Sequence, residues 1–182
     1  MNRHELKHLI VLILCFVLIG RLTYQIQQSK HAKYFAKNEM VKTNTIYNID
    51  ADPMLDTTVA VGLQIYQIDN IHIGIRYTSD HKPIKAGNYQ LEAYTVNEGN
   101  LYLITLIETD RKKSIELIAH ELTHVRQLYD KRIIVDGDDI IWKGKLINPM
   151  PEYMKRPWEI EAFQYELDLA QRIENALYEN EN

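Results

Sequence analysis

Cysteine, glycine and long hydrophobic runs are scarce in this sequence, and each shortage excludes a class of protein. A single cysteine, Cys15, occurs among 182 residues, so the chain forms no intramolecular disulfide and no cysteine-based metal site. Only 7 glycines are present, and none belongs to a phosphate-binding loop. The net charge of -4 and the lack of a basic stripe argue against nucleic acid as a partner. What remains is a cysteine-free domain suited to a reducing compartment or to a bacterial envelope.

The N-terminus holds an unbroken apolar run over residues 9–19, preceded by Arg3 and Lys7. At about 11 residues this run is shorter than the roughly 20 needed to span a bilayer, although Lys7 and Arg21 could extend it by snorkelling. No small-x-small cleavage site follows it. We therefore interpret residues 1–24 as an uncleaved signal anchor, with a cleaved signal peptide as the alternative. The chain would be held at a membrane with its main domain outside the cytoplasm, or secreted after cleavage.

A polar segment separates this anchor from the predicted folded domain. Residues 25–47 are rich in Gln and Lys and indicate a tether, and the turn-rich stretch 48–58 indicates the start of a domain that covers 48–182. Apolar and alternating patterns then predict four strands, at residues 59–68, 71–77, 89–96 and 101–108. The letters NEGN between the last two favour a hairpin turn, whereas 80–88 is expected to form a loop.

The period becomes helical from Arg111 onward. Apolar residues recur at three- and four-residue steps, which predicts an amphipathic helix with a core face of Ile115, Ile118, Leu122, Val125 and Tyr129. A hairpin with its turn at Asp136-Gly137 is expected over 132–145, and a second helix over 157–178. The sequence thus predicts an α+β domain in which a small, mostly antiparallel sheet packs on two helices.

The first of these helices contains the letters HELTH. His120 and His124 are four residues apart and so lie on one helix face, where their imidazoles can bind one ion. Glu121, next to the first histidine, is placed to act as a general base on a water molecule activated by zinc. Leu117 and Leu128 bracket the pair on that face, as expected at the floor of a cleft.

A catalytic zinc ion takes three protein ligands, so a third must come from another element. No histidine follows His124, and the earlier ones lie in the anchor, the tether, a polar strand face or a loop. In the second helix, Glu159 shares the inward face with Ala162, which would allow a close helix approach, whereas Glu161 falls on the expected solvent side. Glu159 is therefore the predicted ligand and Glu161 the fallback.

HExxH followed by a glutamate on a later helix, in an E-x-x-A setting, resembles the gluzincin metallopeptidases and in particular their small single-domain members. The stretches AHELTHVRQLYD, WKGK and RPWEIEAF also resemble small peptidase-like proteins of phages and bacteria, so the resemblance covers residues 100–180. It implies that His120, His124 and Glu159 bind Zn²⁺, that Glu121 is the general base, and that a peptide or protein is the substrate. It also implies that the strand at 101–108 borders the cleft and pairs with substrate backbone.

The sequence departs from the gluzincin pattern in one respect. Many gluzincins have Asp or Asn four residues after the ligand glutamate, where it supports a zinc-binding histidine, and here that position is Phe163. The support must come from elsewhere, with Glu166 or a backbone carbonyl as the candidates. Tyr153, Arg156 and Tyr165 are available as donors to an oxyanion, and the sequence does not choose among them.

Two other interpretations stay open from the sequence. The chain could be a non-catalytic metal-binding envelope protein that uses a peptidase-like scaffold to bind a partner. It could also hold no metal, with HELTH as an amphipathic helix that carries two histidines by coincidence. The sequence gives no indication of oligomeric state.

Overall fold

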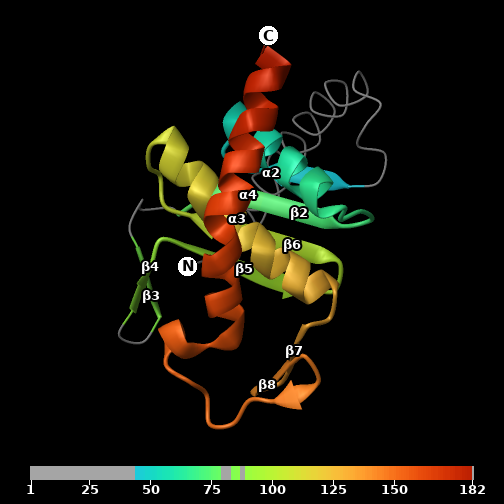
Figure 1. Ribbon diagram of the computed structural model, residues 1–182, viewed down its shortest axis with the longest axis vertical. Coiled ribbons are helices and arrows are strands. Elements are labelled where there is room, and N and C mark those ends of the chain that lie inside the picture. The colour runs from blue at the N-terminus through green and yellow to red at the C-terminus, as the bar shows by residue number, and fades with distance from the viewer. Residues whose placement is uncertain (1–43, 79–82, 87–88, 182) are drawn as a thin grey trace, which may run out of the picture. The chain divides into compact units, whose positions relative to one another are not determined.

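The computed structural model describes residues 44–78, 83–86 and 89–181 (Figure 1). The expected anchor at residues 1–24 and most of the expected tether lie outside these residues. Across the described part of the chain, no helix has both the length and the apolar character needed to cross a membrane.

Four strands form a mixed sheet with the order β1-β2-β6-β5. Their bounds are Thr45–Asn48 for β1, His72–Tyr77 for β2, Leu101–Leu106 for β6 and Ala93–Glu98 for β5. β1 and β6 both run parallel to β2, and only β5 is antiparallel to its neighbour. The prediction of a mostly antiparallel sheet is therefore wrong, although the α+β class is confirmed. β1 also lies in the sheet although residues 45–47 were expected in the tether.

The helix α2, Pro53–Tyr66, occupies the stretch where the sequence analysis placed a turn-rich opening and a strand at 59–68. Its start is specified locally, because Asp52 caps the Met54 N–H and Pro53 stands in the first turn. Leu55, Val59 and Leu63 are four residues apart and all fully buried, which is a helical period. The strand was expected because valine and isoleucine favour strands and part of this run alternates. That pattern was given more weight than the helix-start residues Asp52 and Pro53, and the prediction was wrong. The helix is the crossover that parallel pairing of β1 with β2 requires.

The other strand predictions are largely confirmed. The strand expected at 71–77 is β2, and the NEGN turn joins β5 to β6 with Gly99 at a positive φ of 65°. The run expected at 89–96 is divided, since β4 (Tyr89–Leu91) leaves the main sheet and pairs with β3 (Ile84–Ala86) in the stretch expected as a loop.

Both predicted helices are present. The helix α3, Arg111–Tyr129, begins at Asp110, whose carboxylate accepts a hydrogen bond from the Lys113 N–H. The helix α4, Pro157–Glu181, begins at the predicted proline. Between them lie a three-stranded antiparallel sheet and a short 3₁₀ turn, η1. Their bounds are Ile133–Asp136 for β7, Asp139–Trp142 for β8, Lys145–Leu146 for β9 and Tyr153–Lys155 for η1.

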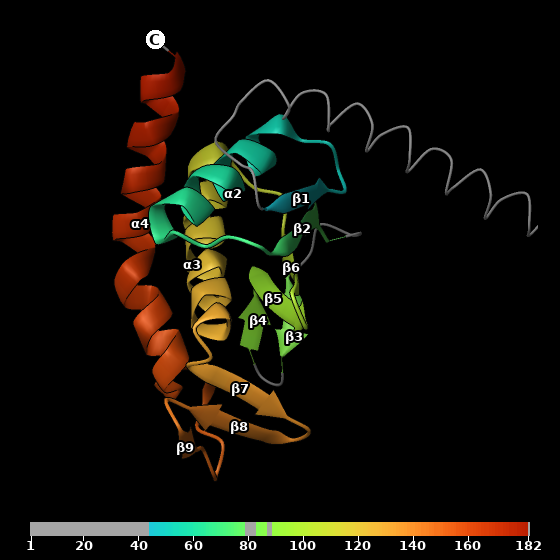
Figure 2. The ribbon, with the colours of Figure 1, turned by 90° about the vertical axis from the view of Figure 1, so that its right-hand side faces the viewer.

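The helices lie on one face of the mixed sheet in two further layers (Figure 2). α3 packs on β5 and β6, α2 packs beside it, and α4 covers both helices from the far side. Gly62 of α2 permits this close packing, because a Cβ there would lie 2.3 Å from Leu122 Cδ1. Leu122 is fully buried, so its replacement by alanine is expected to cost about 2–5 kcal/mol. The layers fix α3 between the sheet and α4, and the predicted site lies where these elements meet.

Candidate metal centre

The two histidines of α3 face the same side of the helix, one turn apart. The centroids of the His120 and His124 rings are 4.9 Å apart, and both side chains are largely buried. They lie beside the apolar stripe rather than on it, as the sequence predicted, because Ile118, Leu122 and Val125 turn into the core. The helix therefore places the two imidazoles next to each other on the same side of α3.

Glu159 of α4 completes the group. Its Oε2 atom lies 3.4 Å from His120 Nε2 and 3.3 Å from His124 Nε2. Ala162, one turn further along α4, is fully buried, as expected for a close approach of α3 and α4. The side chain placed beside the histidines is thus the predicted Glu159 and not Glu161.

The geometry of these three side chains fits a metal ion. One ligand atom from each lies within 4.8 Å of the others, and no other such cluster occurs among the residues that the structure describes. Around a tetrahedral zinc ion with bonds of about 2.0–2.1 Å, ligand atoms are about 3.3 Å apart, which matches the histidine–glutamate distances. Glu159 Oε2 is also fully buried without a hydrogen-bond partner. Its nearest polar neighbours are the two imidazole nitrogens, and a cation between these three atoms would satisfy the oxygen.

The histidines and the carboxylates shift one another's pKa values. Burial lowers the pKa of His120, but the carboxylates of Glu159 and Glu166 outweigh burial and raise the pKa to about 9. Burial raises the pKa of Glu159, and the two imidazoles outweigh it and hold that pKa far below its ordinary value. A metal ion at this site would compete with protons for the imidazole nitrogens.

Glu121 is held beside the ligands by a contact that the sequence did not reveal. Thr95 of β5 donates a hydrogen bond of 2.7 Å from its hydroxyl to Glu121 Oε2. Glu121 is almost completely buried, and burial raises its pKa although both histidines and Thr95 lower it. A carboxylate with a raised pKa beside a metal site is suited to accept and release a proton.

Each histidine has a partner for its other ring nitrogen. Glu166 Oε2 lies 3.0 Å from His120 Nδ1, so Glu166, one of the two candidates from the sequence, takes this role. Phe163 stands where many gluzincins have Asp or Asn, and the centroids of its ring and the His120 ring are 4.6 Å apart. His124 Nδ1 lies 2.9 Å from Gln127 Oε1. Gln127 was missed, although its position three residues after His124 on the same helix face was a usable signal.

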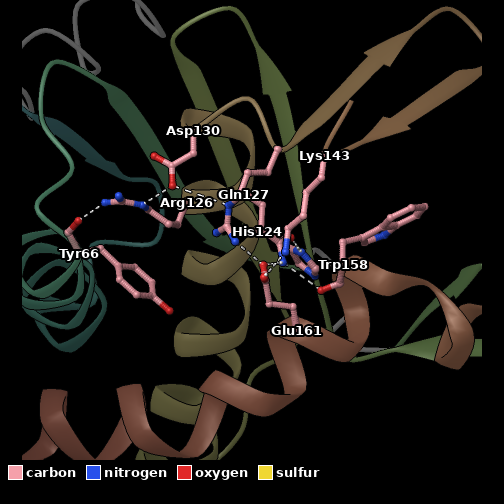
Figure 3. A network of polar contacts seen from close by, with 9 residues as sticks. Tyr66, His124, Arg126, Gln127, Asp130, Lys143, Trp158 and Glu161 are labelled. Carbon is pink, nitrogen blue, oxygen red and sulfur yellow. Dashed lines mark hydrogen bonds and ion pairs between the residues drawn. The ribbon is translucent and has the colours of Figure 1, made fainter. Parts of the chain in front are cut away.

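Glu161 occupies a different environment from the one predicted. It was expected on the solvent side, but its side chain is only 14 % exposed and forms an ion pair with Arg132. It also contacts Lys143 and Gln127 (Figure 3). Burial raises the pKa of Glu161, and these partners outweigh burial and lower it. The prediction of a solvent-facing Glu161 is therefore wrong, because Arg132 and Lys143 come from a hairpin whose position the helical period could not indicate.

The site opens into a cleft of about 990 Å³ that Glu121, His124 and Glu159 line together with β5 and the β7–β8 hairpin. A smaller hollow of about 220 Å³ is lined by Glu121, His120 and Glu166 among others. Tyr153 borders both spaces, and Arg156 borders the larger one. Tyr165 is exposed and lines neither. Of the three oxyanion donors considered from the sequence, two thus face the cleft.

The strand at the cleft is not the predicted one. β6, expected to pair with substrate, is paired with β2 on one side and β5 on the other, so it has no free edge. β5 is the edge strand of the mixed sheet, and residues 93–97 line the cleft. An extended chain in the cleft could add to β5 by backbone hydrogen bonds.

Comparison with known proteins gives no relative: no family model, no curated protein and no solved structure matches the chain.

Proposed function

We propose that this protein is a zinc-dependent peptidase of the gluzincin type. The observation that carries the proposal is the convergence of His120 Nε2, His124 Nε2 and Glu159 Oε2, with the buried carboxylate of Glu121 facing the same cleft. Two histidines and a glutamate with a fourth position open to the cleft are the donor set of a catalytic zinc site.

The residues around the site have separable roles. A zinc ion held there would act as a Lewis acid that polarises a peptide carbonyl and lowers the pKa of a water molecule. Glu121 takes the proton from the attacking water and gives it to the leaving amine, while Thr95 keeps its carboxylate oriented. The free edge of β5 holds the substrate backbone in an extended form. Tyr153, which borders the cleft, can donate a hydrogen bond to the oxyanion.

The proposal includes the location of the domain. Residues 1–24 would hold it at a membrane, with the peptide or protein substrate outside the cytoplasm. Fractionation of cells that express the full chain checks this, because an anchored chain stays in the membrane fraction after a high-salt wash.

The test of the activity uses the full chain in detergent, because the proposal includes anchoring by residues 1–24. Zinc per chain is measured by elemental analysis, and cleavage of a mixed peptide library is followed by mass spectrometry. Glu121→Gln is expected to retain zinc near one per chain and to lose cleavage. Glu116→Gln, the same change more than one turn earlier on α3 and outside the cleft lining, is the matched control and should keep both.

Each alternative gives its own result. Zinc near one per chain with no cleavage by the wild-type protein supports the non-catalytic metal-binding protein. Zinc near zero in a folded protein supplied with the metal refutes the peptidase.

A further inference from the structure

Gln127 is a fully buried polar side chain in α3, and all of its hydrogen-bonding atoms are engaged. Its Oε1 atom lies 2.9 Å from His124 Nδ1. Its Nε2 atom donates to the Trp158 carbonyl oxygen and to Glu161 Oε2, each at 3.0 Å. Figure 3 shows the amide lying between the histidine and the glutamate.

These contacts determine which way the amide points. Trp158 O and Glu161 Oε2 are both acceptors, so each requires an N–H, and together they take both N–H groups of the Gln127 amide. If the amide were flipped, its oxygen would face the oxygens of Trp158 and Glu161, and its NH₂ group would face His124. The oxygen of Gln127 therefore faces His124.

The orientation of the amide in turn selects the tautomer of His124. An oxygen acceptor at Nδ1 requires that Nδ1 carry the hydrogen, so the neutral ring, which is the form that binds a metal, has its lone pair on Nε2. Nε2 is the atom that lies 3.3 Å from Glu159 Oε2 at the candidate metal centre. The ring thus presents its lone pair where an ion would bind.

Glu161 is itself fixed from the other side. Arg132 Nη1 lies 2.6 Å from Glu161 Oε2, and Lys143 Nζ lies 3.0 Å from Oε1. Arg132 directly precedes β7, and Lys143 directly follows β8, so the two cations come from the base of the hairpin that lines the cleft. Backbone bonds reinforce this junction, since Arg132 N donates to the Gln127 carbonyl oxygen and Lys143 N donates to that of Arg132.

We infer that Gln127 is a positioning residue that sets the tautomer and ring orientation of His124 for metal binding, and that Glu161, held by the hairpin, keeps the Gln127 amide in the required orientation. This rests on the proposed metal site. It gives Glu161 a role that is distinct from that of a ligand, and it links the cleft wall to one ligand of the ion.

The test measures metal affinity rather than turnover. Gln127→Leu keeps the size of the side chain and removes its hydrogen bonds, and loss of an outer partner of a metal-binding histidine typically weakens affinity by about 10–100-fold. Zinc affinity is measured by competition with a chromogenic chelator, and the visible spectrum of the Co²⁺-loaded protein reports the ligand geometry. We expect weaker zinc binding and an altered Co²⁺ spectrum. Gln127→Asn, which withdraws the amide oxygen by one methylene, gives the same test if the leucine variant does not fold.

Two further variants separate positioning from general destabilisation. Thr123→Val, at a residue of α3 that lines neither the cleft nor the smaller hollow, removes a hydrogen bond to Tyr66 of α2 and is expected to retain affinity and spectrum. Glu161→Leu keeps a side chain of similar size and removes one of the two acceptors that orient the Gln127 amide. It is expected to weaken zinc binding by a smaller factor than Gln127→Leu, because the Gln127 amide still donates to the Trp158 carbonyl oxygen.

The outcomes distinguish this inference from the proposed function. Wild-type affinity and an unchanged spectrum in Gln127→Leu overturn the positioning role and leave the zinc site intact. Equal losses in Gln127→Leu and Thr123→Val, or wild-type affinity in Glu161→Leu, also overturn it. A wild-type protein that binds no zinc removes the proposed function and this inference together.

Discussion

Two glutamates that are two residues apart on α4 provide a sharp test of the metal centre. Glu159 Oε2 lies 3.3–3.4 Å from both imidazole nitrogens, whereas Glu161 is paired with Arg132 and Lys143. The same substitution, Glu→Gln, can be made at each position, and each variant loses one buried or half-buried negative charge. The structure predicts that only Glu159→Gln loses the metal.

The magnitude follows from the number of ligands. Zinc sites in proteins bind with apparent free energies of about 10–16 kcal/mol, so one ligand in three accounts for about 3–5 kcal/mol. This corresponds to a dissociation constant weaker by about 10²–10⁴-fold in Glu159→Gln. Glu161→Gln keeps an acceptor for the Gln127 amide and should change zinc affinity by no more than about threefold, well below the loss of an outer partner.

The assay is chelator competition on the full chain, with circular dichroism of each variant as the control for folding. Loss of zinc from Glu161→Gln and retention by Glu159→Gln would identify Glu161 as the ligand and refute the assignment made here. Retention by both folded variants would show that neither carboxylate binds the ion.

Three further predictions concern the surroundings of the site. Thr95→Val removes the hydroxyl that donates to Glu121 without leaving a void. It should lower kcat/KM for peptide cleavage by about 10–100-fold, the effect expected for loss of a hydrogen bond to a charged group, and leave zinc content unchanged. Unchanged kcat/KM would contradict the role of Thr95. Because the pKa of His120 is raised to about 9 and a bound ion requires neutral imidazole, zinc affinity should rise between pH 6.5 and 9, by up to about tenfold per pH unit, and a flat profile would argue against His120 as a ligand. Zinc at about 100 times its dissociation constant should raise the free energy of unfolding by about 2.7 kcal/mol. Thermal unfolding should show this as a higher Tm that a chelator reverses. A Tm that changes with neither zinc nor chelator would contradict a metal site in the folded state.

The sequence alone determined the features that depend on local periodicity. The spacing of His120 and His124 on one helix face follows from 3.6 residues per turn, and the cap at Asp110 and the proline at 157 mark where α3 and α4 begin. The same reasoning selected Glu159 over Glu161, because position on a helix face is also a local property. The strand β2 and the β5–β6 hairpin were predictable from alternation and from a short turn.

Other features depended on segments far apart in the chain, and only the tertiary structure decided them. The parallel direction of β1 and β2 could be inferred only if Pro53–Tyr66 was known to be a helix. The apolar residues of that stretch fit both the helical and the strand period, so packing had to decide between them. Thr95 reaches Glu121 because β5 is the edge strand above α3, and Glu161 is covered because the hairpin folds back onto α4. These contacts join residues 26 and 29 positions apart, and no local pattern encodes which distant groups will share a cavity. The candidate ligands could be predicted from the helices, but the residues that orient them were fixed by how sheet, hairpin and helices pack together.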